Sequence, residues 1–260
     1  MTGRAKRTLA AALALVAVGF VLYAGTLDSP FVFDDVASIE ENAHIESLWP
    51  LSRALGAPPG AGSSGRPLVS LSLALNYALG GREVLGYHIF NVATLVLSGL
   101  ALFGLARRLL ARAGHAGGDG LAFALALVWT VHPLHTDTLN HVVYRNGSMM
   151  GMFFLASLYA SVRGYDQDAP PRWSVLCVLA AVAAMACKEV AVSLPLVVLA
   201  FDRQFGAGGF RTAFARRPRM YVGLAASWIV LALCVLSGDR GDSVGFDHTE
   251  VIDGVKVVQM

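Results

Sequence analysis

Apolar runs alternate with short polar or basic stretches along most of this chain. Several of these runs approach the roughly 20 residues that an α-helix needs to cross the hydrocarbon core of a bilayer. They predict membrane-spanning helices at residues 8–27, 84–106, 120–135, 141–162, 173–187, 190–202 and 220–237. The pattern therefore predicts an all-α polytopic membrane protein with about seven transmembrane helices.

Composition agrees with this class. The chain is 55% hydrophobic and only 15% charged, whereas soluble domains carry about 25% charged residues. We therefore expect an integral membrane protein and no nucleic-acid partner. Arginine far outnumbers lysine, and alanine and glycine are abundant, which suggests a GC-rich bacterial genome and a bacterial inner membrane. The three cysteines form no metal-binding or redox spacing.

The positive charges predict an orientation. With the N-terminus placed inside, 13 of the 20 lysines and arginines fall on the inner side and 7 on the outer side. The positive-inside rule therefore favours a cytoplasmic N-terminus. The first apolar run is longer than the core of a secretory signal, so we interpret it as an uncleaved span.

One ambiguous segment, residues 173–202, carries Lys188 and Glu189 near its middle. As a single helix it would be roughly 45 Å long, well beyond the roughly 30 Å of a bilayer core. Two short helices that meet at Lys188-Glu189 are the better interpretation. The polar stretch at 132–137 separates two further spans in the same way, and the two polar-tipped hairpins suggest a cavity open to the outer face.

The longest connection, residues 28–83, is predicted to lie outside the membrane. Apolar positions in 39–55 recur with a rough helical period. Residues 58–65 are rich in proline, glycine and serine and predict a flexible break. A second helix is expected at 68–79, since Pro67 is well placed at its start. We expect two interfacial helices on the outer surface.

The chain therefore divides into two predicted parts. Residues 1–237 form the transmembrane domain, which includes the extracytoplasmic loop 28–83 with its interfacial helices. Residues 238–260 are polar and short, and we interpret them as an extracytoplasmic tail that is truncated.

Two adjacent carboxylates, Asp34 and Asp35, follow the first apolar run. They could be solvated loop acids or a helix cap. Their apolar neighbours, among them Phe33 and Val36, form a setting that raises the pKa of a carboxylate and suits a general base. A metal site would need more oxygen ligands than the neighbouring sequence offers.

Three cations are candidates for binding an anion on the outer side. Arg66 either faces lipid head groups or binds phosphate, and Arg145 is interpreted as an anion ligand. Lys188 and Glu189 could pair to fix helix packing. However, charged residues at membrane depth are functional candidates, so we favour Lys188 as an anion ligand that Glu189 orients.

His132 and His135, with His141 and Asp137 nearby, resemble half of a zinc site. Zinc needs three or four ligands, and Pro133 breaks the regular helical spacing. Local hydrogen bonding or substrate contact is therefore favoured over metal binding. We assign no metal site and no cofactor, and we leave a divalent cation open.

Several motifs in this order resemble a known family. They are Phe31-Val-Phe-Asp-Asp35, Gly65-Arg-Pro-Leu-Val-Ser-Leu-Ser-Leu-Ala-Leu-Asn-Tyr77, Gly86-Tyr-His-Ile-Phe-Asn91, His132-Pro-Leu-His-Thr136 and Lys188-Glu189. The set resembles the N-terminal transmembrane part of the TPR-containing O-mannosyltransferases and their bacterial relatives. That family lies in the GT-C superfamily of glycosyltransferases, so the resemblance implies a GT-C-like fold.

The resemblance implies transfer of a sugar from a polyprenyl-phosphate carrier to an acceptor hydroxyl outside the cytoplasm. The expected partners are membrane lipid, a polyprenyl-phosphate sugar donor, and a protein or glycan acceptor. In this family an Asp of the first outer loop is the catalytic base, which here matches Asp34 or Asp35. The available phosphate-binding residues are Arg66, Arg145 and Lys188. The supporting residues are His132, His135 and Glu189.

Two departures from the family pattern keep a second hypothesis open. Family members usually carry further spans and a TPR region, whereas this chain ends at Met260. In the segment 143–148 an arginine followed by an acidic residue would be more usual. The alternative is a non-catalytic or truncated membrane module that serves as an assembly scaffold.

Overall fold

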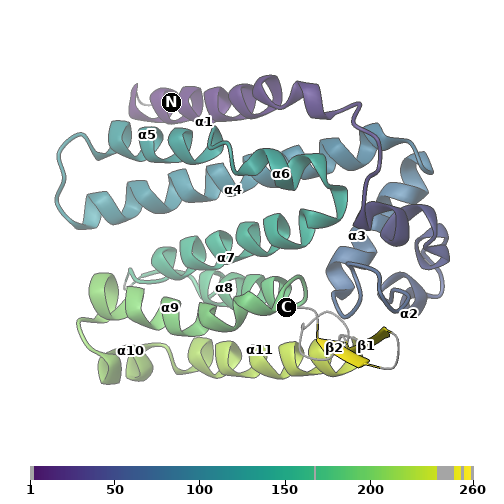
Figure 1. The fold of residues 1–260 in the computed structure, drawn as a ribbon. Helices are drawn as coiled ribbons and strands as arrows, with labels where there is room; N and C mark the ends of the chain where they lie inside the picture. The colour runs from purple at the N-terminus through teal and green to yellow at the C-terminus, as the bar shows by residue number, and fades with distance from the viewer. Residues whose placement is uncertain (1–2, 167, 239–248, 253–254, 259–260) are drawn as a thin grey trace.

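The described part of the chain is predominantly helical (Figure 1). The structure is a computed structural model that describes residues 3–166, 168–238, 249–252 and 255–258. The α-helices are α1 Gly3–Leu22, α2 Leu51–Ala54, α3 Pro67–Gly80, α4 Val84–Arg112, α5 Gly118–Thr130, α6 His135–Asn140, α7 Arg145–Arg163, α8 Arg172–Met185, α9 Leu194–Asp202, α10 Phe210–Arg216 and α11 Pro218–Ser237. Shorter 3₁₀ or π turns are η1 Ala24–Thr26, η2 Val36–Glu40, η3 Ala43–Glu46, η4 Val142–Tyr144, η5 Glu189–Ser193 and η6 Arg203–Ala207.

Four helical segments within the described residues are long and apolar enough to cross a membrane. They are Gly3–Leu22, Val84–Arg112, Glu189–Ala207 and Pro218–Ser237. Three shorter apolar helices, α3, α5 and α8, accompany them. Each of the seven apolar segments predicted from the sequence contains a helix, and an integral membrane protein is the class that these helices support. A total of seven spans stays a prediction.

The long helices lie side by side (Figure 1). Helix α4 packs against α1 and α5 on one side and against α7 on the other. Helix α8 packs against both α7 and α11, and α9 also contacts α7. The predicted break between two short helices is present, because α8 ends at Met185 and η5 begins at Glu189.

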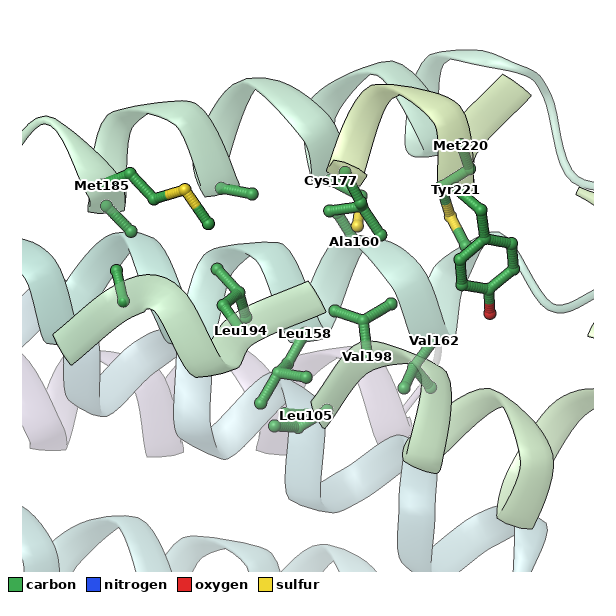
Figure 2. Close-up of a cluster of buried hydrophobic side chains, with 14 of the residues drawn as sticks. Leu105, Leu158, Ala160, Val162, Cys177, Met185, Leu194, Val198, Met220 and Tyr221 are labelled. Carbon is green, nitrogen blue, oxygen red and sulfur yellow. The ribbon is translucent and has the colours of Figure 1, made fainter. Parts of the chain in front are cut away.

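The main core joins α4, α7, α8, α9 and α11 (Figure 2). Large buried side chains such as Leu158, Met185 and Leu194 alternate there with small ones such as Ala160 and Ala181. Lipid tails are as apolar as leucine, so burial of apolar surface drives helix association weakly in a membrane. Close packing is therefore the main source of stability, and small residues allow it.

Glycines mark the closest approach of the helices around α4. A Cβ added at Gly19 would lie 2.5 Å from Cγ2 of Val96, and one added at Gly99 would lie 2.6 Å from Oγ1 of Thr130. Real Cβ atoms essentially never come so close to other atoms. The α1–α4 and α4–α5 contacts therefore require glycine at these two positions.

Replacing Gly19 by alanine should lower the free energy of unfolding by about 1–3 kcal/mol, the usual cost of overpacking. Val96 is branched at Cβ and has little rotational freedom with which to yield. Gly151 in α7 is the matched control, because a Cβ there meets nothing within 4 Å. Gly151→Ala should leave stability unchanged or raised. Thermal unfolding in detergent measures both variants, and equal effects would contradict the close-packing argument.

The four segments that the charge count assigns to the inner side lie at one end of the bundle. Arg4 near the N-terminus and Arg107 in α4 both pair with Asp119, at 3.1 and 2.9 Å. Arg112 pairs with Asp166 in the α7–α8 connection at 2.6 Å and donates to the carbonyl of Phe205 in η6 at 3.3 Å. These links gather the arginine-rich connections into one surface. A cytoplasmic location for that surface stays a prediction.

One detail of the predicted loop was wrong. The expected helix over 39–55 is broken into η2, η3 and α2. Pro50 sits inside this stretch, has no N–H to donate, and restricts the residue before it, so a continuous helix is disfavoured. Apart from the helices, the described residues include one short antiparallel pair of strands, β1 Thr249–Ile252 and β2 Val255–Val258.

Candidate functional site

Asp35 is completely buried and anchors the connection before α7. Its Oδ1 accepts a hydrogen bond from the N–H of Val143 at 2.7 Å, and its Oδ2 accepts one from the N–H of Val142 at 3.0 Å. The N–H of Val32 lies 3.4 Å from Oδ2. These donors satisfy a buried carboxylate, which would otherwise be very costly. Asp35 therefore ties the loop between α1 and α3 to the start of α7.

Asp34 lies next to this anchor but points outward. It is exposed and makes no hydrogen bond or ion pair within the described part of the chain. Its neighbour Phe33 has a φ of 51°, a left-handed conformation that is uncommon for a bulky residue, and its side chain is 80% exposed. The ring of Phe33 stacks on His141, which stacks on Tyr144. A fixed loop thus presents a free carboxylate beside a stack of rings.

Arg66, Glu189 and Lys188 come together at the same end of the bundle. Nη2 of Arg66 lies 3.5 Å from Oε1 of Glu189, and Nη1 donates to the carbonyl of Gly62 at 2.6 Å. Lys188 is half-buried, and its Nζ lies 3.8 Å from the position of a Cβ on Gly147, in the first turn of α7. Lys188 forms no ion pair among the residues that the structure describes. Its charge is therefore unneutralised there.

Arg145 occupies a different position from the one expected for an anion ligand. It is fully buried, and its guanidinium donates to Oδ1 of Asn76 at 2.7 Å, the carbonyl of Tyr87 at 3.1 Å, the carbonyl of Val142 at 3.3 Å and Oγ of Ser72 at 3.3 Å. These acceptors come from α3, α4 and η4. In this arrangement the guanidinium holds three elements together rather than facing an open site.

The predicted histidine pair does not come together around a shared ligand. His132 is exposed, and its Nδ1 accepts from the N–H of Leu134 at 3.3 Å. His135 is half-buried, and its Nε2 lies 2.9 Å from the carbonyl of Trp129. Within the described residues no group of three or more His, Cys, Asp or Glu side chains could hold a metal ion. Local hydrogen bonding accounts for both rings.

Sequence reasoning missed His88, which links the two loops of the site. This side chain of α4 is fully buried. Its Nδ1 lies 2.9 Å from the carbonyl of Leu139, and its Nε2 lies 3.0 Å from the carbonyl of Ser29. One ring therefore connects the segment before Asp34 with the segment before α7. Its sequence signal was its place in the motif Gly86-Tyr-His-Ile-Phe-Asn91, which supported the family resemblance but gave this histidine no role.

Gly147 and Ser148 were also missed. They lie in the first turn of α7, where backbone N–H groups and the helix dipole favour anions. Oγ of Ser148 is buried and has no hydrogen-bond partner within the described part of the chain. Together with Lys188, these two residues form a small site that carries one positive charge. The site can be identified only from the fold, because Lys188 is distant from Gly147 and Ser148 in the sequence.

The fold and this polar end define a class: a polytopic helical membrane protein with charged side chains collected at one end of its bundle. No family model and no solved structure matches the chain. Curated proteins do match it. It is 34% identical to the protein O-mannosyl-transferase Tmtc1 of Drosophila melanogaster over 190 residues, which is 70% of this chain and 21% of that protein. It is 32% identical to Tmtc2 of the same organism over 206 residues and 31% identical to human TMTC2 over 200 residues.

The human match covers 72% of this chain and 23% of the human protein, and the Drosophila Tmtc2 match covers 74% and 21%. This chain is therefore a homologue of the Tmtc protein O-mannosyl-transferases, and the resemblance predicted from the ordered motifs is confirmed. The chain spans between about a fifth and a quarter of the length of the relatives it matches.

Proposed function

We propose that this chain forms the sugar-transfer part of a membrane glycosyltransferase. In this proposal it moves mannose from a polyprenyl-phosphate carrier to the hydroxyl of a protein acceptor on the extracytoplasmic face. The names of its relatives support the transferase class and the sugar. The single observation that carries the proposal is that the outward-facing Asp34 and the cations Arg66 and Lys188 belong to connections at the same end of the bundle.

Asp34 is the general base in this proposal. It is exposed and not engaged by other described groups, so an acceptor hydroxyl can reach its carboxylate. Asp34 removes the hydroxyl proton as the acceptor oxygen forms a bond to the anomeric carbon of the sugar. The bond from that carbon to the carrier phosphate breaks, and the phosphate leaves with the electron pair. Asp35 holds the loop that positions its neighbour.

Lys188 binds the carrier phosphate in this proposal. Its unneutralised ammonium lies beside the first turn of α7, where Ser148 offers a buried hydroxyl. Arg66 is nearby through its contact with Glu189 and adds a second cation to the same end. These groups offset the charge that develops on the leaving phosphate.

The test is a transfer assay with the purified chain in lipid nanodiscs. The donor is radiolabelled mannose on polyprenyl phosphate, and the acceptor is a peptide rich in serine and threonine. Label should appear on the peptide, and its release by β-elimination shows attachment to a hydroxyl. A folded protein that transfers no label above the protein-free blank would contradict the proposal and support the scaffold alternative.

Replacing Lys188 by glutamine should raise the KM for the donor by about tenfold. A hydrogen bond to a charged group contributes about 1.5–3 kcal/mol, and 1.4 kcal/mol corresponds to tenfold in affinity. The KM for the peptide should not change. Lys6→Gln at the opposite end of the bundle is the control. Equal donor KM values for the two variants would remove Lys188 from the phosphate site.

A further inference from the structure

A large cavity lies at the other end of the bundle, where the arginine-rich connections gather. Its volume is about 890 Å³, within the range of ligand pockets in proteins. The lining residues come from α1, α4, α5 and the connection before α5. Two of these helices, α1 and α4, are long and apolar enough to cross a membrane. The cavity is far from the proposed transfer site and does not depend on it.

The lining changes from charged to apolar with depth along each helix. On α1 it runs from Arg4 and Arg7 at the end of the bundle to Ala11 further in. On α4 Arg107 lies one turn closer to the end than Phe103. A ligand that fills this cavity therefore needs a polar head and an apolar portion that follows it inward.

Helix α5 repeats the gradient, from Asp119 at its start to Phe123 one turn deeper. The rings of Phe103 and Phe123 meet edge to face, with centroids 6.3 Å apart. The inner part of the cavity is therefore bounded by two packed aromatic rings. This part offers an apolar surface and no charge.

The outer part of the cavity is positively charged. Three arginines and one aspartate line it, so its formal net charge is +2 when His115 is neutral. Asp119 accepts from Nε of both Arg4 and Arg107, which fixes two of the guanidinium groups. Arg7 forms no ion pair or hydrogen bond within the described residues. Arginine groups in this arrangement suit the oxygens of a phosphate.

We propose that this cavity binds the phosphate head group of an anionic membrane phospholipid. The phosphate lies among the guanidinium groups of Arg4, Arg7 and Arg107, and one acyl chain continues inward along Phe103 and Phe123. The charge selects an anionic head group over a zwitterionic one. The apolar depth selects a lipid over free phosphate. Both features come from the same three helices.

The test is native mass spectrometry of the whole chain released from nanodiscs that contain equal amounts of phosphatidylglycerol and phosphatidylcholine. The protein should retain phosphatidylglycerol in preference to phosphatidylcholine. Millimolar inorganic phosphate should neither displace this lipid nor bind in its place. Displacement of the lipid by inorganic phosphate would overturn the lipid assignment in favour of a free-phosphate site. Equal retention of the two lipids would overturn the proposal altogether.

Variants locate the bound lipid. Arg7→Gln should lower phosphatidylglycerol occupancy roughly tenfold, because one charge-assisted contact is lost. Since Arg7 has no partner in the described chain, this change leaves the fold intact. Lys6→Gln is the matched control, because Lys6 is an exposed neighbour that does not line the cavity. Equal occupancy in the two variants would contradict the proposed site.

A change at the inner end of the cavity is an independent test. Ala11→Phe places a ring where we propose that the acyl chain lies. It should lower lipid occupancy severalfold while all the arginines remain. Unchanged occupancy would show that the lipid is held elsewhere on the basic surface.

Discussion

Replacing Asp34 by asparagine is expected to lower the rate constant of sugar transfer by about 10²–10⁴-fold, the usual contribution of a general base. Asparagine has nearly the same shape as aspartate but does not accept a proton at neutral pH. Asp34 is exposed and forms no interaction within the described residues, so the variant should fold normally. The measurement is the initial rate of mannose transfer to the peptide at saturating donor and acceptor.

Glu41→Gln is the matched control for this prediction. Glu41 is another exposed carboxylate of the loop between α1 and α3, and its loss removes the same charge from the same region. The control variant should transfer sugar at close to the wild-type rate. Comparable rates for Asp34→Asn and Glu41→Gln would show that the carboxylate at position 34 takes no part in proton transfer.

The sequence was most informative about the helices, because their signal is local. A run such as 220–237 reveals its helix by its own length and apolarity. A helix break was predicted at Lys188-Glu189, because a single helix over residues 173–202 would be longer than the bilayer core is thick. For residues 39–55 the prediction was wrong. The spacing of apolar residues predicted one helix, but Pro50 disfavours a continuous helix there. Periodicity describes a preference, and one backbone restriction can override it.

The sequence was least informative about the separate roles of neighbouring charged residues. Asp34 and Asp35 are identical side chains one residue apart, yet one is exposed and the other is buried. The difference arises because Asp35 meets the N–H groups of Val142 and Val143, more than 100 residues away in the chain. For the same reason, the sequence predicts an anion-binding role for Arg145 and gives no sign of its buried contacts. Its partners lie on other helices, and no local pattern reports them.

Replacing Arg145 by alanine is expected to lower the free energy of unfolding by about 3–5 kcal/mol, because several buried groups and the charge of Asp35 lose the cation that compensates them. The change removes the donor that serves the buried oxygens of Ser72 and Asn76. It also removes the cation that interacts electrostatically with the buried carboxylate of Asp35. The carbonyl of Val142 accepts from Nε of Arg145 while the N–H of the same residue donates to Asp35. One peptide segment therefore connects the two charges, and loosening it should also slow sugar transfer.

Thermal unfolding in detergent measures this effect against Arg82→Ala. Arg82 pairs with Glu46 at 3.1 Å, but its side chain is 50% exposed, so its loss should cost less than about 1 kcal/mol. Arg145→Lys separates the two roles considered for this residue. A lysine ammonium does not reproduce the planar fork of the guanidinium, so this variant should also be destabilised. An Arg145→Lys variant with wild-type stability and a raised donor KM would return Arg145 to the phosphate-binding role that its charge first suggested.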